Sequence, residues 1–261
     1  MSEVIRRTKI VATMGPATES DEAIDRLIKA GVDVVRLNFS HGTVEEHKAR
    51  ADKIRRIGNA NHRHLAILAD LQGPKIRTEK FREGKVELAI GDHFWLNTEC
   101  TDGEGDEQQV GVTYKKLPQD VKAGNSLVLD DGRIVLQVVT VDGPRIECTV
   151  TVGGELSDNK GINLKGGGLT AEVLTDKDRA DIKTAALINC DYLAVSFPRN
   201  ANDMMQARKL LEAEGCKAGL VAKIERAEAL ENIEEIIQAS EAIMIARGDL
   251  GVEIGDAKLP A

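Results

Sequence analysis

Six short apolar runs recur along the chain, and their spacing constrains the fold more than any other feature. They begin near residues 8, 33, 64, 191, 219 and 241, so successive starts lie 25, 31, 127, 28 and 22 residues apart. Short apolar runs that alternate with helical segments predict βα units and a parallel sheet. We therefore expect an α/β fold: a (β/α)8 TIM-type barrel, incomplete with about six strands, that carries an inserted domain after its third strand.

Helix-start signals support this alternation. Ser20 is placed to cap a helix that begins at Asp21, whereas Thr43 with Glu46 matches a capping box. Residues 175 and 178 cap a helix in the same way. The last predicted helix, after residue 225, is expected to carry Leu230, Ile233 and Ile237 on one face.

The long gap has a different character. Fourteen of the 24 glycines lie between Gly84 and Gly168, among alternating runs such as KVELAI and RIECTVTV. Turn signals occur at residues 131–132 and 142–143. We expect an all-β insert without a helix of its own. The predicted boundaries are 1–72 for the first part of the barrel domain, 73–169 for the β-barrel lid and 170–261 for the second, truncated part.

Composition excludes several classes of function. The net charge of −8 and the 3% aromatic content argue against nucleic acid as a partner. No apolar stretch is long enough for a membrane helix, and the N-terminus lacks a signal-peptide core, so we expect a cytoplasmic protein. The four cysteines show no metal-ligand spacing, which favours reduced, buried thiols.

Polar residues gather where the predicted strands end, the edge that carries the active site in such barrels. Lys223 and Glu225 alternate along one strand and are expected on the same face. Glu225 and Asp249 are oxygen ligands of the kind that hold Mg²⁺. The amine of Lys223 is suited either to forming a Schiff base or to neutralising the charge of a phosphate. A buried Lys223–Glu225 ion pair is an equally weighted alternative. Gly248 favours a site, because glycine gives a ligand access to the backbone.

Arg36 lies within an apolar strand, where an unpaired guanidinium is costly. Either Asp70 on the next strand pairs with it, or it binds an anionic substrate, or both. Asn38 and Ser40 offer neutral oxygens for a monovalent cation or a phosphate. The run at residues 165–168 lacks the order of a phosphate-binding loop and is better explained as a hinge. Just before it, Lys160 is able to reach a ligand if the insert closes as a lid.

The segments TKIVATMGPAT, VVRLNFSHG, LADLQGPKIRT, DNKGIN, AVSFPR, VAKIERAEA and IARGDLGVEIG together resemble the bacterial pyruvate kinases. The resemblance covers the whole chain in order. It implies glycolytic transfer of the phosphoryl group from phosphoenolpyruvate to ADP, with Mg²⁺ or Mn²⁺ as the divalent metal. It also implies a homotetramer for the full-length enzyme.

The resemblance implies roles for individual residues. Arg36 is similar to the arginine that binds the substrate phosphate, and Lys223 to the cation that stabilises the transferring group. Glu225 and Asp249 resemble the divalent-metal ligands, and Gly248 a backbone contact to the substrate. The monovalent-cation ligands correspond to Asn38, Ser40, Asp70 and Leu71. The nucleotide contacts correspond to Pro16, Asn38, His41, Arg77 and Lys160.

Two departures from the family pattern have consequences. Potassium-dependent members carry glutamate where this chain has Lys75, and Leu71 replaces a polar residue nearby. We therefore expect activity that does not require K⁺. The family also continues beyond residue 261 with two further strands, a threonine that helps to protonate the enolate, and a C-terminal domain. We expect a longer natural protein or a fragment of reduced stability.

Two alternative functions are weighed. A Mg²⁺-dependent phosphoenolpyruvate or pyruvate lyase on a similar barrel would have neither a lid insert nor nucleotide contacts such as Arg77. A truncated, inactive ligand-binding fragment of the same enzyme is distinguished only by the region beyond residue 261.

Overall fold

The computed structural model describes residues 6–260, which fall into two compact units. The first unit comprises the chain up to residue 73 together with 173–223 and 233–244. The second comprises residues 74–172, 224–232 and those from 245 onward. Within the described range, no helix combines the length and the apolar character needed to cross a bilayer.

The first unit is built on one six-stranded sheet whose strands follow chain order. The strands are β1 (Val11–Thr13), β2 (Val34–Asn38), β3 (Ala66–Asp70), β12 (Tyr192–Val195), β13 (Gly219–Ile224) and β14 (Ala242–Ile245). The pairs from β1 to β13 are parallel. Sequential parallel strands joined by helices are the pattern of a βα barrel, so the predicted α/β class is confirmed for an incomplete barrel.

Helices α1 (Asp21–Lys29), α2 (Val44–Ala60), α4 (Asp176–Leu187), α5 (Ala201–Ala213) and α7 (Ile233–Gln238) belong to this unit, which also contains the short η1 (Pro16–Thr18). The predicted caps are confirmed. The Ser20 side chain accepts from the backbone of α1, and capping boxes open α2 at Thr43 and α4 at Thr175. These caps satisfy first-turn N–H groups and fix where each helix begins.

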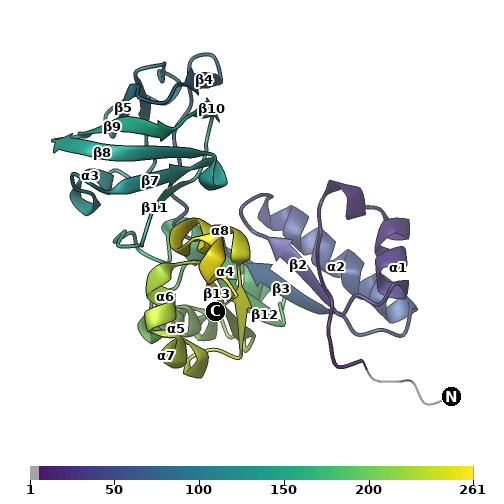
Figure 1. Ribbon diagram of the computed structural model, residues 1–261. Coiled ribbons are helices and arrows are strands. Elements are labelled where there is room, and N and C mark those ends of the chain that lie inside the picture. The colour runs from purple at the N-terminus through teal and green to yellow at the C-terminus, as the bar shows by residue number, and fades with distance from the viewer. Residues whose placement is uncertain (1–5, 261) are drawn as a thin grey trace. The chain divides into compact units, whose positions relative to one another are not determined.

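The second unit contains two antiparallel arrangements of strands (Figure 1). The larger sheet has the order β11 (Ile162–Leu164), β7 (Ser126–Leu129), β8 (Ile134–Asp142), β9 (Arg145–Val152), β5 (His93–Asn97) and β6 (Gln109–Gly111). Its last pair, β5 with β6, is parallel. The smaller sheet pairs β4 (Lys85–Leu88) with β10 (Gly154–Ser157). The hairpin β8–β9 turns at the predicted residues 142–143.

A continuous apolar core fills this β region. It includes Phe94, Leu96, Leu127, Ile134 and Ile146, all fully buried. A core of this kind supplies its own hydrophobic driving force for folding.

Three local predictions are wrong. The insert is not free of helix, because α3 (Leu117–Asp120) and the 3-10 turn η2 (Asp130–Gly132) lie within it. The last predicted helix is split into α6 (Ala227–Glu231) and α7. Its buried positions are Ala229 and Ile236, whereas Leu230 and Ile237 are exposed. Asn232 separates the two helices, so the single helical period that the prediction assumes is interrupted there.

The third correction concerns the sixth strand, since the run EAIMIAR from residue 241 predicts a strand that continues to Arg247. Strand β14 ends at Ile245, and α8 (Arg247–Ile254) begins at that arginine, followed by η3 (Asp256–Lys258). Gly248 and Gly251 both lie inside α8. Because glycine disfavours helix interiors, residues 247–254 show no helical pattern in the sequence.

Candidate active site

The alternation of the parallel strands places apolar and charged residues on one face of the sheet. Leu68, Ala194 and Val221 form a buried cluster on this face, packed by Val34 and Tyr192. Two residues further along each strand, the same face carries Arg36, Asp70, Ser196 and Lys223. The strand registers place them on one face, since Asn38 pairs with Asp70, and Ala194 pairs with both Asp70 and Val221. Polar residues thus meet at the carboxyl ends of neighbouring strands.

Asp70 is the centre of this polar group. Its side chain is 1% exposed, and its Oδ2 accepts a hydrogen bond of 2.6 Å from Arg36 Nε. Arg36 Nη2 lies 2.5 Å from the same oxygen, and Arg36 Nη1 donates to Thr13 Oγ1 on β1. The predicted pairing of Arg36 with Asp70 is therefore confirmed. It orients the guanidinium and compensates its charge.

Lys223 approaches the other oxygen of the same carboxylate. Its Nζ lies 3.3 Å from Asp70 Oδ1 and donates a 2.7 Å hydrogen bond to Ser196 Oγ, while its side chain is 12% exposed. Asp70 Oδ1 has no hydrogen-bond partner of good geometry, so its contact with the ammonium is an ion pair. Two cations from strands β2 and β13 thus share one buried carboxylate.

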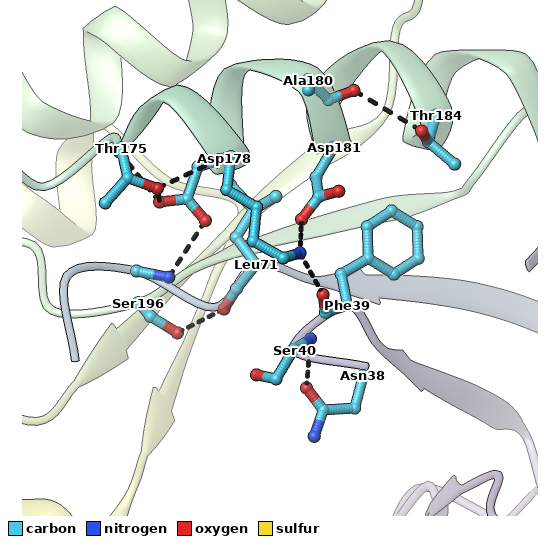
Figure 2. A network of polar contacts seen from close by, with 12 residues as sticks. Asn38, Phe39, Ser40, Leu71, Thr175, Asp178, Ala180, Asp181, Thr184 and Ser196 are labelled. Atoms are coloured by element: carbon cyan, nitrogen blue, oxygen red, sulfur yellow. Dashed lines mark hydrogen bonds and ion pairs between the residues drawn. The ribbon is translucent and has the colours of Figure 1, made fainter. Parts of the chain in front are cut away.

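The turns beside this group are held by backbone contacts (Figure 2). Asn38 Oδ1 accepts from the N–H of Ser40 at 3.1 Å. Lys177 on α4 donates to the carbonyl of Phe39 and to Asp181. The side-chain oxygen of Asn38 is therefore used within its own turn. Of the two remaining residues predicted at this end of the sheet, Pro16 opens η1 and His41 precedes α2, and both are exposed.

The second unit holds the predicted metal ligands. Glu225 directly follows β13 and is buried at 2% exposure. Since β13 ends at Ile224, the strand alternation predicted for Lys223 and Glu225 does not extend to the glutamate. Asp249 lies in the first turn of α8, and its Oδ1 is 3.1 Å from Lys75 Nζ. Gly248 of the same turn has open space where a side chain would stand.

Lys160 and Arg77 both contact the β region of this unit. Lys160 Nζ pairs with Asp130 Oδ1 at 2.8 Å, and Arg77 Nη1 donates to the carbonyl of Asn159. Arg77 also forms an isolated bridge with Gly161. The two cations therefore lie on adjacent segments of the same unit.

The glycine run at residues 165–168 is not arranged to bind phosphate. The N–H of Gly168 donates to Glu228 Oε1, and the N–H of Gly166 donates to the carbonyl of Glu253. A side chain at Gly167 would meet the Glu228 carboxylate at 2.6 Å. These N–H groups face a carboxylate and a carbonyl, which agrees with the prediction that this run is not a phosphate-binding loop.

Two of the cysteine thiols, Cys148 and Cys190, are buried. Burial raises the pKa of Cys148 to about 12, and burial also raises the pKa of Cys190. None of the four cysteines forms a disulfide. Residues 6–260 contain no group of three or more His, Cys, Asp or Glu side chains arranged to hold a metal ion. Two carboxylates completed by substrate and water remain the mode of binding that suits Mg²⁺.

An incomplete βα barrel with a β insert, and charged side chains at its strand ends, has the architecture of the βα-barrel enzymes, which carry their active sites at that edge. Comparison with known families makes this specific: residues 5–261 match the pyruvate kinase barrel domain, and the chain belongs to the pyruvate kinase family.

Curated relatives agree. The chain is 58% identical to pyruvate kinase II of Salmonella typhimurium over 99% of its length, which spans 55% of that protein. It is 54% identical to a pyruvate kinase of Haemophilus influenzae, again over 99% of this chain and 55% of the relative. A Staphylococcus aureus pyruvate kinase is 42% identical, over 98% of this chain and 44% of the relative. The chain thus spans about half the length of the curated relatives it matches.

Sequence reasoning missed part of the polar group. Ser196 and Thr13 carry no predicted role, yet the registers place the hydroxyl of Ser196 beside Lys223 on the next strand and that of Thr13 beside Arg36. The signal for both is a hydroxyl two residues beyond an aligned apolar position, and it is recognised only once the register is known.

Proposed function

We propose that this chain forms the catalytic part of a pyruvate kinase, which transfers the phosphoryl group of phosphoenolpyruvate to ADP and yields pyruvate and ATP in glycolysis. Membership of the family and the buried Arg36–Asp70–Lys223 group support the proposal. The observation that carries it is this one carboxylate on β3, which orients two cations from strands on either side of it, β2 and β13. The β insert with its own core counts against the lyase alternative, which would have none.

Arg36 is proposed to bind the substrate phosphate. Asp70 engages Nε and Nη2 of its guanidinium, and Thr13 engages Nη1, so the side chain is held before substrate arrives. Its side chain remains 26% exposed, which leaves the guanidinium accessible to an anion. Orientation in advance lowers the entropy cost of binding and of reaching the transition state.

Lys223 is proposed as the catalytic cation. Phosphoryl transfer from an enol phosphate leaves negative charge on the enolate oxygen and on the transferring group, and a fixed ammonium stabilises both. Asp70 and Ser196 hold Nζ in place. Because the side chain is only 12% exposed, its charge is poorly screened by water.

Glu225 and Asp249 are proposed to hold the divalent cation, Mg²⁺ or Mn²⁺. Their chemistry fits, since hard carboxylate oxygens are the preferred ligands of both ions. The ion would supply charge neutralisation for the phosphoryl oxygens. Gly248 is proposed to offer its N–H to the substrate, because the first turn of a helix leaves such groups without a partner in the helix.

The nucleotide phosphates are proposed to be bound by Arg77 and Lys160, with Pro16, Asn38 and His41 on the nucleotide side of the barrel unit. Lys160 is paired with Asp130 in this structure, so binding a phosphate there exchanges one anion for another. Exchange of this kind costs less than uncovering a bare cation.

Activity without added K⁺ is proposed on two grounds. Lys75 carries a positive charge where the K⁺-dependent relatives carry an acid, and its Nζ lies 3.1 Å from Asp249. The oxygens assigned to K⁺ are also engaged: Asn38 accepts from Ser40, Asp70 binds two cations, and the carbonyl of Leu71 accepts from Ser196. The test compares turnover with and without K⁺ at constant ionic strength. A large rise in turnover on adding K⁺ would contradict the proposal.

A cytoplasmic location and a homotetrameric assembly of the whole enzyme are proposed from the family relationship. Nucleic acid and membrane are not proposed as partners, given the net charge of −8.

The proposed function is tested by a coupled assay for Mg²⁺- and ADP-dependent pyruvate formation. The natural gene product that contains these residues is assayed beside the 261-residue chain. In the natural product, Lys223→Met is expected to abolish turnover while Mg²⁺ binding is largely retained. Lys48→Met, which removes an exposed lysine paired with Asp52, is the matched control and is expected to turn over normally. Near-normal turnover of Lys223→Met would refute the role given to that lysine.

A further inference from the structure

Ser196 links the ammonium of Lys223 to the backbone just after Asp70. Its hydroxyl has one proton, which it donates to the carbonyl of Leu71 at 2.8 Å. The oxygen therefore presents its lone pairs to Lys223, whose Nζ donates to it at 2.7 Å. The side chain is 1% exposed. Figure 2 shows the bond from Ser196 to Leu71. One buried hydroxyl thus connects the lysine on β13 to the turn that follows β3.

The position of this hydroxyl is set by close packing on both sides. Gly73 has φ +68, and a Cβ there would lie 2.7 Å from Ser196 Cβ and 3.0 Å from the Phe197 ring. Phe197 itself has φ +57, an unusual conformation for a bulky residue. Backbone conformations of this kind persist only where the surroundings enforce them, and they cluster at functional sites.

A second layer of contacts fixes the turn from the helix side. The N–H of Gly73 donates to Asp178 Oδ1 at 3.0 Å, and the other oxygen of Asp178 completes the capping box with Thr175. The N–H of Leu71 donates to the carbonyl of Ala194. The start of α4 therefore holds the turn at residues 71–73 in place, and this turn holds the hydroxyl of Ser196.

We propose that Ser196 is a positioning residue for the phosphoryl-transfer reaction, holding the ammonium of Lys223 at the depth and angle that the transition state requires. The inference rests on the proposed function. Asp70 attracts Lys223 by charge, but its Oδ1 lacks a well-aligned hydrogen bond. Ser196 supplies the directional contact, because a hydrogen bond depends steeply on angle whereas an ion pair does not.

The test measures kcat and KM for Ser196→Ala in the natural gene product. A misplacement of about 1 Å in a catalytic group costs on the order of a hundredfold, so we expect kcat to fall by about tenfold to a hundredfold. The KM for phosphoenolpyruvate is expected to change much less, because Arg36 keeps its contacts.

Two further variants keep the test decisive. Ser196→Cys preserves the shape of the side chain but offers a much weaker acceptor, so it is expected to show the same fall in kcat with little change in KM even if the alanine variant is insoluble. Thr184→Val removes another buried hydroxyl, which donates to the carbonyl of Ala180 on α4, and it is expected to leave kcat and KM unchanged.

The outcomes separate this inference from the proposed function. If the unmodified protein forms no pyruvate, the proposed function fails first. If it turns over and Lys223→Met does not, while a folded Ser196 variant keeps kcat within about twofold of the unmodified protein, the positioning role is overturned alone. A fall in kcat that Thr184→Val matches, or that a comparable rise in KM accompanies, would reduce Ser196 to a structural role and overturn it as well.

Discussion

The two regions of the molecule place their charged side chains in opposite ways. On the parallel sheet, Asp70, Lys223 and Arg36 lie together at the strand ends, with exposures of 1%, 12% and 26%. On the antiparallel strands, pairs such as Lys85 with Glu155 are more than half exposed, while the interior is apolar. The second region keeps such charged side chains at its surface, in contact with water. The first retains ionic groups where burial makes them costly, which is the usual mark of a site.

The largest expected effect tests the apolar side of this comparison. Phe94 is fully buried in the core of the β region. We expect Phe94→Ala to lower the free energy of unfolding by about 4 kcal/mol, since large-to-small changes lose transfer energy and leave a cavity. Chemical denaturation at pH 6 and pH 9 measures it, and the loss is expected to be the same at both. Ile90→Ala, at an exposed position, is the control.

The next effect tests the ionic side. Asp70→Asn removes the charge that compensates Arg36 and Lys223. We expect a loss of about 3 kcal/mol in the free energy of unfolding, together with loss of turnover, because two partly buried cations are left uncompensated. Asp52→Asn, which breaks an exposed pair with Lys48, is the control. If the variant has the same free energy of unfolding as the unmodified chain, the carboxylate does not contribute to the stability of the fold.

A third prediction concerns a buried carboxyl on α8. Burial raises the pKa of Glu253 from 4.5 to about 7; nearby Glu228 adds to the rise, while the N–H of Ala227 and the charge of Arg226 oppose it. An acid whose pKa is raised by folding stabilises the folded chain when protonated. That stability is present below pH 4.5 and is lost as the pH rises towards 7.

Glu253→Gln mimics the protonated form and keeps an oxygen that accepts from Ala227. At pH 8 we expect this variant to be more stable than the unmodified chain by about 2 kcal/mol, with little difference at pH 4.5. Denaturation curves across this range provide the measurement. Equal stability at both pH values would contradict the raised pKa.

The smallest effect completes the comparison. Lys85 and Glu155 form a close ion pair, but both side chains are more than half exposed. Salt and water screen such a pair, so Lys85→Met is expected to change stability too little to resolve by denaturation. A clear loss that disappears in high salt would mean that surface pairs matter to the β region after all.

Local signals in the sequence predicted most of the fold. Capping residues such as Thr43 and Thr175 specify a helix start by short-range hydrogen bonds, and they were identified from type and spacing alone. Strand order followed from regular spacing. The predicted sixth strand extends two residues too far, because an apolar run does not show where a strand ends and a helix begins. Two glycines in α8 also obscure the apolar periodicity of that helix.

The site was predicted unevenly for the same reason. Arg36 and Asp70 were paired in advance, since adjacent parallel strands bring their ends together. Ser196 was not joined to Lys223, because that contact depends on the register between β12 and β13. Register is set by packing across the sheet, which one strand's sequence does not encode.

The order of the strands also has a consequence in time. On a ribosome, β3 emerges well before its partner β12, because residues 71–191 must be made between them. At about 5–20 residues per second, these 120 or so residues take roughly 6–24 s. During that interval the edge of β3 that later pairs with Tyr192–Ala194 has no strand beside it. The β region has a core of its own, so it has time to fold before β12 is made and can pair with β3.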